Sequence, residues 1–254
     1  MLTLLVARRL AVALPTLVVV LLAAWPIVAF VGIAASRIGY PFDLEWMESG
    51  VIDHVRVVLS GEPLYREPGL EFTPYIYTPG YYYASALVSS VAGVGYLSLR
   101  ALSVVSILAC FACIGAWVYL ETRAVLAGLL AAGLFAATYG QSGYWFDLAR
   151  VDSFCLALAL GGTVLARWGR GHGTGIAAGA LLAAAVLTKQ SAIAFAIPPL
   201  LFRYSGGIRA GVVSTAAFAL VLAGVVLPLE LASGGWFSFY VWTVPGDHAV
   251  VWGS

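Results

Sequence analysis

Charged residues are scarce in this sequence: they make up 10% of its 254 residues, whereas 62% are hydrophobic. A soluble domain carries roughly 25% charged residues, so the composition excludes an ordinary water-soluble globular protein. The net charge is only +1 and no basic tract occurs. The electrostatic footprint of a nucleic-acid partner is therefore missing, and we expect no such partner.

Cysteine is also rare, with three residues in the whole chain, all inside apolar runs. Cys110 and Cys113 form a C-x-x-C pair, a spacing that elsewhere indicates redox or metal chemistry. Cys155 stands alone. Because buried cysteine behaves as a small hydrophobe, we expect three packed thiols and no disulfide framework.

Several catalytic signatures are missing too. There is no Ser-His-Asp order and no H-E-x-x-H motif. The glycine-rich stretch 171–175 follows no predicted strand, so it fails the context test for a dinucleotide-binding loop. Gly175 and Gly179 instead form a G-x-x-x-G pair, which predicts close helix packing.

Long apolar runs dominate what is present, and runs of about 18 residues or more can span a bilayer. The apolar segments are 10–35, 79–93, 98–120, 124–140, 153–168, 174–189, 191–203 and 210–229. The first run exceeds the 7–15 residues of a signal-peptide core, so we interpret it as a retained span. The pattern predicts an all-α, polytopic transmembrane helical bundle of about seven spans, with a possible break around Lys189-Gln190.

The number of spans depends on segment 79–93, which is short and aromatic at its start. If it lies in the membrane interface, the inside holds seven of the 13 basic residues and one of the 12 acidic residues, leaving six and eleven outside. The inside residues are then Arg8, Arg9, Arg123, Arg167, Arg170, Arg203, Arg209 and Glu121. This distribution follows the positive-inside rule. We therefore predict an interfacial helix at 79–93 and a cytoplasmic N-terminus.

The one long hydrophilic stretch, residues 36–78, forms an outer loop in this topology. Within it, apolar residues recur at three- and four-residue steps from Asp43 to Leu59, which predicts an amphipathic helix lying flat on the membrane. Asp43 is a candidate N-cap. Gly61-Glu62-Pro63 ends the helix.

One six-residue stretch of this loop contains three carboxylates, Asp43, Glu45 and Glu48. On a helix, Glu45 and Glu48 share a face. Such a cluster fits a general base aimed at a hydroxyl group. It also fits a divalent cation, Mg or Mn, held by Asp43 and Glu48 through oxygen ligands. A solvated acidic helix face is the alternative.

Further ionisable residues lie at the outer ends of the predicted spans. They are Arg100, Asp147, Arg150, Asp152 and Lys189. Ionisable groups at membrane depth are costly and are candidates for function. Asp152 and Lys189 stand in otherwise apolar sequence. They fit a mutual ion pair that joins two spans, or side chains that extend to the membrane interface, or an outward cavity whose basic groups meet a lipid phosphate.

Four stretches carry a resemblance to a known family. They are YPFDLEWMESG, SGEPLYREP followed by YIYTPGYYY, DLARVDSF and LTKQSAIAF, in family order between about residues 37 and 198. The chain resembles the GT-C class of membrane glycosyltransferases, and within it the group related to protein O-mannosyltransferases (glycosyltransferase family 39-like). Two departures occur: Gly80 stands where the family often has a second proline, and Thr78 stands where relatives have a basic residue.

The resemblance implies a helical bundle with membrane-parallel helices in the first outer loop. It implies transfer of a sugar from a polyprenyl-phosphate donor to a glycan, lipid or protein acceptor on the outer face. Asp43 would be the catalytic base, Asp152 would line the cavity and Lys189 would lie near the donor phosphate. Further substrate contacts would come from Glu45, Glu48, Tyr77 and Arg150.

We expect residues 1–254 to form a single transmembrane domain in a bacterial inner membrane, surrounded by membrane lipids. The chain ends in Gly253-Ser254, directly after an aromatic stretch, and we interpret it as an N-terminal piece of a longer protein. Two other classes stay open. One is a transporter or lipid flippase, although no internal repeat supports it. The other is a non-catalytic membrane subunit that keeps the fold without the chemistry.

Overall fold

The computed structural model describes residues 2–247, with side chains from Ala11 onward except Val12. Within this range every regular element is helical and no strand occurs, which confirms the all-α class. The predictions that rest on Arg8, Arg9, Gly253 and Ser254 lie outside the described side chains and residues.

Five helices are long and apolar enough to cross a membrane. They are α1 (Leu2–Arg37, with the candidate span Ala13–Arg37), α4 (Tyr96–Thr122), α6 (Val151–Trp168), α7 (Gly171–Thr188) and α9 (Ile208–Ser233). The most apolar stretch of α9 is only 11% buried within the protein. Apolar surface of this extent is unfavourable in water and favourable against lipid. The chain is therefore an integral membrane helical bundle.

Two shorter apolar helices belong to the same bundle, α5 (Val125–Ala137) and α8 (Ile193–Arg203). At about 1.5 Å per residue, each is shorter than a hydrocarbon core of roughly 30 Å, so the total of seven spans stays a prediction. The expected break near Lys189 is confirmed. There α7 ends, and a 3-10 turn, η1 (Gln190–Ala192), precedes α8.

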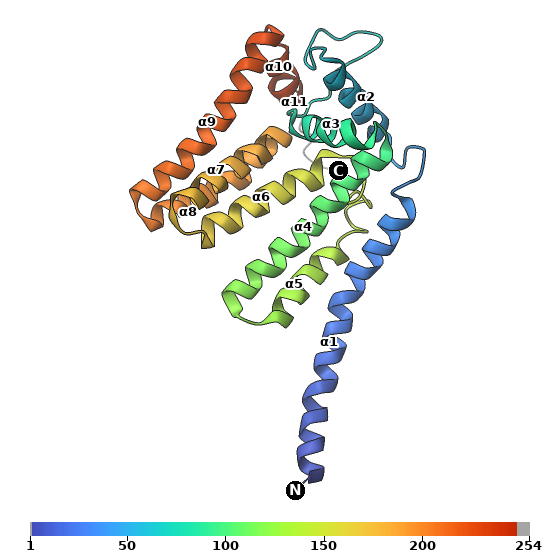
Figure 1. The fold of residues 1–254 in the computed structure, drawn as a ribbon, viewed down its shortest axis with the longest axis vertical. Helices are drawn as coiled ribbons and strands as arrows, with labels where there is room; N and C mark the ends of the chain where they lie inside the picture. Colours follow the sequence, from blue (N-terminus) through green and yellow to red (C-terminus); the bar gives the residue numbers. More distant parts are fainter. Residues whose placement is uncertain (1, 248–254) are drawn as a thin grey trace.

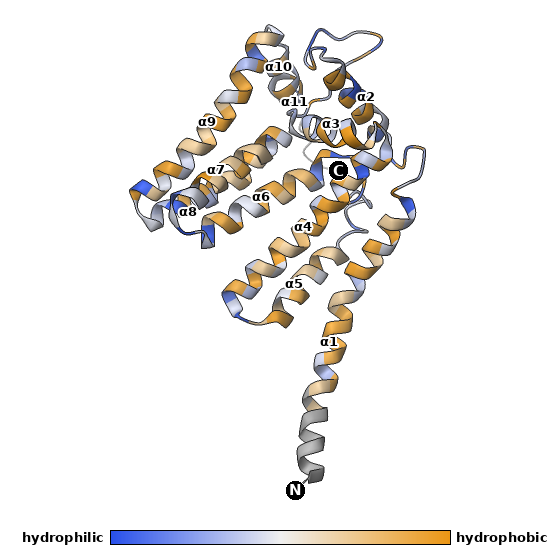
Figure 2. Ribbon diagram, in the orientation of Figure 1, coloured by the Kyte–Doolittle hydropathy of each residue, from blue (hydrophilic) through white to orange (hydrophobic). Residues whose placement is uncertain are grey.

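The helices pack in the order α1, α5, α4, α6, α7 and α9, with α8 against α6, α7 and α9 (Figure 1). We call one side of the bundle the turn side, because there the ends of the helices are joined by the turns after α4, α6 and α8. The turn after α8 contains η2 (Tyr204–Gly206). On the turn side Arg167 pairs with Glu121 at 3.0 Å, and Arg203 donates to the Gly169 carbonyl at 3.1 Å. Hydrophilic residues gather on the turn side and at the opposite ends of the helices, while the stretches of helix between are largely hydrophobic (Figure 2).

The opposite end, which we call the cap side, carries the connecting segments and several further helices. They are α2 (Met47–Ser60), α3 (Gly80–Ala92), α10 (Trp236–Ser238), the π-helix η3 (Phe239–Thr243) and α11 (Val244–Gly246). Helix α3 lies across the ends of α4, α6 and α7 (Figure 1). The segment 79–93 thus does not run along the bundle, which agrees with the charge count. Its depth in a membrane stays a prediction.

An apolar cluster holds the cap together. Val51 and Val55 of α2 pack with Tyr81 and Tyr82 of α3 and with Phe237 of α10, and all five are almost fully buried. The three- and four-residue spacing of α2 is therefore the spacing of a buried face. Because this face meets protein, the helix uses it for packing within the cap.

The start of α2 differs from the prediction. The helix begins at Met47, not at Asp43, and its N-cap Trp46 makes no side-chain cap bond. Asp43 lies before the helix, and its carboxylate accepts a hydrogen bond from the Tyr96 hydroxyl at 2.7 Å. Glu45 instead accepts the Met47 backbone N–H at 3.1 Å. The predicted end is confirmed at Gly61, whose φ of 76° is the left-handed conformation that favours glycine.

Small residues set the helix spacing, as the G-x-x-x-G pair predicts. Gly175 and Gly179 of α7 both face Ser214 of α9, and a Cβ on Gly179 would lie 2.1 Å from the Ser214 carbonyl oxygen. The α7–α9 contact therefore depends on the close approach of the two helix backbones.

The three cysteines are free thiols, as expected.

We expect Gly179→Ala to destabilise the bundle by about 1–3 kcal/mol, the usual cost of overpacking, because a backbone atom cannot rotate away. The matched control is Gly173→Ala in the same helix, where a Cβ meets nothing within 4 Å. Thermal unfolding in detergent measures both. Equal midpoints for the two variants would contradict the close contact.

Candidate functional site

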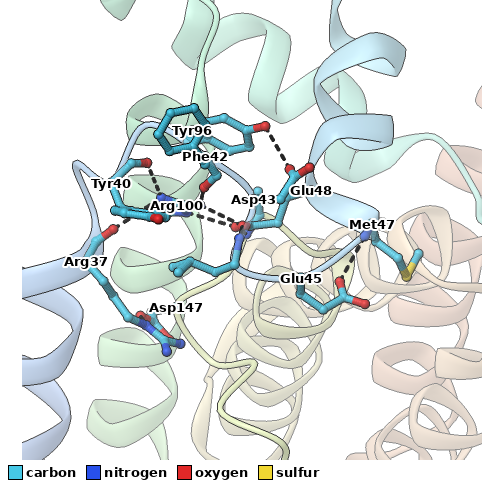
Figure 3. Close-up of polar contacts among 12 residues, drawn as sticks. Arg37, Tyr40, Phe42, Asp43, Glu45, Met47, Glu48, Tyr96, Arg100 and Asp147 are labelled. Atoms are coloured by element: carbon cyan, nitrogen blue, oxygen red, sulfur yellow. Dashed lines mark hydrogen bonds and ion pairs between the residues drawn. The ribbon is translucent and has the colours of Figure 1, made fainter.

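The predicted site residues all lie on the cap side, where loop 38–46, α2 and the segment between α5 and α6 meet the ends of α4 and α7. Ion pairs dominate this region. Four of them join an arginine or lysine to a carboxylate from another part of the chain, and Figure 3 shows the group around Arg100.

Arg100 and Glu48 form a buried pair in which neither side chain is exposed. Arg100 Nε donates to Glu48 Oε1 at 2.9 Å, and Nη2 donates to Oε2 at 2.6 Å. Glu48 also accepts the backbone N–H groups of Leu44 and Ala149, both at 2.8 Å. An ionised carboxylate has about four acceptor positions, so Glu48 is saturated by the protein itself.

The remaining donors of Arg100 hold the loop before α2. They bond to the carbonyl oxygens of Arg37 at 3.2 Å, Tyr40 at 2.7 Å and Phe42 at 2.7 Å (Figure 3). All five N–H groups of the guanidinium are then used. Because Phe42 and Leu44 are both anchored, the backbone of Asp43 between them is fixed.

Asp43 itself is exposed, and Tyr96 orients its carboxylate by donating to Oδ1 at 2.7 Å (Figure 3). No basic side chain within the described residues forms an ion pair with it. Asp43 therefore presents one oriented carboxylate at the surface of the cap.

A second network runs from Glu45 to Lys189. Arg150 Nη1 donates to Glu45 at 2.8 Å, and its Nε donates to Asp152 Oδ2 at 3.2 Å. Lys189 Nζ donates to the other oxygen, Asp152 Oδ1, at 2.7 Å and lies 5.6 Å from the centroid of the Tyr77 ring. Five of the predicted site residues thus form one continuous chain of contacts.

Asp147 belongs to a third group with a different partner. It forms a bidentate pair with Arg37, both contacts at 2.6 Å, and accepts the Tyr139 hydroxyl at 2.7 Å. Only 2% of its side chain is exposed. Asp147 therefore ties the end of α1 to the segment before α6.

Two cavities adjoin the second network. One, of about 500 Å³, is lined by Asp152 and Ser153 together with Ser142, Trp145 and Phe146. The Arg150 guanidinium lies over the Trp145 ring, with its Cζ atom 4.1 Å from the ring centroid. The lining of this cavity includes neither Asp43 nor Lys189.

The other cavity is an apolar groove of about 510 Å³ between α3, α6, α7 and α9. Its lining includes Pro79, Tyr83, Phe154, Thr188 and Pro228. The groove extends to Thr188, the last residue of α7, which directly precedes Lys189.

The two departures from the family pattern have local physical reasons. A Cβ on Gly80 would lie 2.7 Å from the Leu187 carbonyl oxygen, so a proline does not fit where α3 approaches α7. Thr78 is buried, and its hydroxyl donates to the Val186 carbonyl at 2.8 Å. Both residues dock the start of α3 on the end of α7.

No protein-family model, curated protein or solved structure matches this chain. The functional argument therefore rests on the geometry of its own residues.

The predicted residues separate into two groups in space. Tyr77, Arg150, Asp152 and Lys189 join Glu45 in one network, and the Asp152–Lys189 pair is the mutual ion pair that the sequence offered as one alternative. Glu48 belongs to the Arg100 group, and Asp43 adjoins that group through Tyr96. Pattern reasoning missed Tyr96, because an aromatic residue at the start of an apolar run resembles an interface anchor.

The metal expectation for Asp43 and Glu48 meets a geometric obstacle. Both oxygens of Glu48 are occupied by internal donors, so it has no free position for a hard cation. Within residues 2–247, no three His, Cys, Asp or Glu side chains are grouped so that they could hold a metal ion. The residues present do not fit a two-carboxylate cation site, and we assign Glu48 a structural role.

His54 anchors the loop that follows α2. With its Nδ1 donating to the Gly50 carbonyl at 2.6 Å, its Nε2 accepts the Tyr75 backbone N–H at 2.8 Å. The ring also lies against Phe72, Tyr75 and Tyr82. Burial lowers the pKa of His54 to about 4, against smaller opposing effects of the Gly50 hydrogen bond and the Asp53 charge.

We expect Arg100→Met to destabilise the protein by about 3–5 kcal/mol, because it leaves a buried carboxylate without a counter-charge. Arg100→Met combined with Glu48→Leu should recover part of that loss. Arg56→Met removes an exposed arginine from its pair with Asp53 and should change stability by less than about 1 kcal/mol. Reversible unfolding in mixed detergent measures all three. A double variant less stable than Arg100→Met alone would contradict the unpaired charge of Glu48 as the cause of the loss.

We expect His54 to make stability depend on pH. The folded pKa of about 4 lies below the ordinary value of 6.5, so the contribution is complete above pH 6.5 and is lost as the pH falls toward 4. Between pH 7 and pH 5 the loss should be about 2 kcal/mol. It is measured as the difference in pH dependence between the unaltered protein and His54→Asn. Parallel stability curves for the two proteins would refute this origin.

Proposed function

We propose that this protein is a GT-C type glycosyltransferase that moves a sugar from a polyprenyl-phosphate donor to an acceptor hydroxyl, with Asp43 as the base. One observation carries the proposal. Among the carboxylates predicted for the site or lying close to it, Glu45, Glu48, Asp147 and Asp152 are each paired with arginine or lysine, whereas Asp43 is exposed and has no such partner.

The geometry suits a general base. A base must be ionised, accessible and held in position within reach of the proton it removes. Arg100 fixes the backbone on one side of Asp43, and Glu48 fixes it on the other by accepting the Leu44 N–H. Tyr96 binds Oδ1 and leaves Oδ2 for an acceptor hydroxyl.

The reaction would then proceed as a displacement at the sugar. Asp43 takes the acceptor proton as the acceptor oxygen forms a bond to the anomeric carbon. The bond from that carbon to the phosphate oxygen breaks, and polyprenyl phosphate leaves with the electron pair. The acceptor proton passes from Asp43 to solvent.

The cationic end of the second network supplies charge for the donor phosphate. The Lys189 side chain is 31% exposed and shares Asp152 with Arg150. The Lys189 ammonium has three N–H donors, so it could bind a phosphate while keeping its hydrogen bond to Asp152. This arrangement supports Lys189 as the phosphate contact, with Asp152 holding it in place.

The apolar groove beside Thr188 supports a lipid-linked donor. Its walls come from α3, α6, α7 and α9, and it reaches the end of α7 where Lys189 stands. A prenyl chain in this groove would leave its phosphate near the lysine. The cavity beside Asp152 is then available for a sugar, with the Trp145 ring as one wall.

The charge distribution supports an extracytoplasmic cap. The turn side carries Arg123, Arg167, Arg170, Arg203 and Arg209 against the single carboxylate Glu121. By the positive-inside rule this side faces the cytoplasm. The proposal places the protein in a bacterial inner membrane, with the site on the outer face.

We expect Asp43→Asn to lower sugar transfer by about 10²- to 10⁴-fold, the range for a positioned general base. The assay uses the purified full chain in proteoliposomes, a panel of polyprenyl-phospho-sugars and a panel of glycan, lipid and peptide acceptors. The matched control is Asp53→Asn, an exposed aspartate on the same segment, paired only with Arg56. It should keep full activity.

The outcomes separate the candidate functions. Transfer by the unaltered protein with an active Asp43→Asn variant would remove Asp43 as the base and leave the glycosyltransferase intact. No transfer from any donor, together with protein-dependent movement of a fluorescent polyprenyl phosphate across the vesicle membrane, would replace the proposal with a lipid flippase. The absence of both activities in a folded protein would favour a non-catalytic subunit.

A further inference from the structure

The turn side carries more positive charge than its own residues neutralise. Arg123, Arg170 and Arg209 are exposed, and none of them forms an ion pair with a carboxylate in the described part of the chain. Arg167 pairs only with Glu121, and both side chains are partly exposed, at 37% and 42%. An exposed pair of this kind is weak, so the Arg167 guanidinium is available to a stronger anion.

An apolar groove opens directly beside Arg167. It lies between α4, α6 and α8, has a volume of about 300 Å³ and is lined by Trp117, Pro198, Pro199 and Phe202 as well as Arg167. The two prolines have no backbone N–H, so this wall offers no donor to water. The groove thus combines one cationic end with an apolar floor.

Aromatic contacts indicate the depth of this groove in the membrane. The Trp117 and Trp168 rings meet edge to face with centroids 4.5 Å apart. The Arg167 guanidinium lies 5.2 Å from the Trp168 ring centroid and 5.3 Å from that of Phe202. Tryptophan concentrates at the level of lipid headgroups, so we expect the cationic end of the groove at the depth of the lipid phosphates.

We propose that this groove binds one anionic phospholipid, with its phosphate on Arg167 and an acyl chain along Pro198, Pro199 and Phe202. Charge complementarity selects the occupant. A zwitterionic lipid brings its own cation to a surface that already carries excess positive charge, whereas an anionic lipid neutralises it. The site is separate from the cap and does not depend on the proposed transferase activity.

The test is a lipid titration of the purified full chain in detergent, followed by native mass spectrometry. Dioleoyl phosphatidylglycerol should bind more tightly than dioleoyl phosphatidylcholine. Arg167→Gln should weaken phosphatidylglycerol binding by roughly tenfold, the loss of one charge-assisted contact. Glu121→Gln should strengthen it, because Glu121 competes for the same guanidinium.

Arg56→Gln is the matched control, since it removes an arginine from an exposed aspartate pair on the cap side and should leave lipid binding unchanged. Equal affinity for the two lipids, or equal effects of Arg167→Gln and Arg56→Gln, would overturn the proposal. Full competition by inorganic phosphate would show an anion site without a lipid. Circular dichroism confirms that each variant is folded, so a loss of binding reports on the groove.

Discussion

The pairing of Arg100 with Glu48 is the interaction on which the cap side depends. Two charges removed from water are costly unless every donor and acceptor is satisfied, and here the five N–H groups of Arg100 and the four acceptor positions of Glu48 all have partners. These bonds join α4, which carries Arg100, to the end of α1, the loop before α2, α2 itself and the segment before α6. A buried arginine at the start of a membrane helix thus organises four parts of the chain at once.

This arrangement explains why one acidic residue of the loop differs from its neighbours. Glu48 is used to hold the fold, and Glu45 is paired with Arg150. Asp43 lies between two anchored residues and is turned toward the surface by Tyr96. An accessible carboxylate held on a rigid scaffold suits general-base catalysis, which is why the transferase proposal centres on Asp43. The turn side shows the reverse case, an uncompensated arginine beside an apolar groove, and there the chemistry favours an anionic lipid.

Much of the bundle could be predicted because its causes are local. The apolar segments 98–120, 153–168 and 210–229 became α4, α6 and α9 with small shifts at their ends. The charge count separated segment 79–93 from the helices that run along the bundle. The predicted start of α2 at Asp43 was wrong, because the backbone on either side of Asp43 is held by Glu48 and by Arg100, which is 58 residues from Phe42 along the chain. No local pattern contains that partner.

The sequence by itself determined the all-α membrane class, the distribution of basic and acidic residues between the two ends of the bundle, and the region where the site candidates lie. These follow from composition and periodicity, which act over a few turns of helix. Only the tertiary structure decided which carboxylates are paired. Asp43, Glu45 and Glu48 look alike in the sequence, and their roles diverge because ion pairs form between residues separated by 52 and 105 positions. Such a pairing depends on how helices are placed in space, a property that the order of residues along a short segment does not specify.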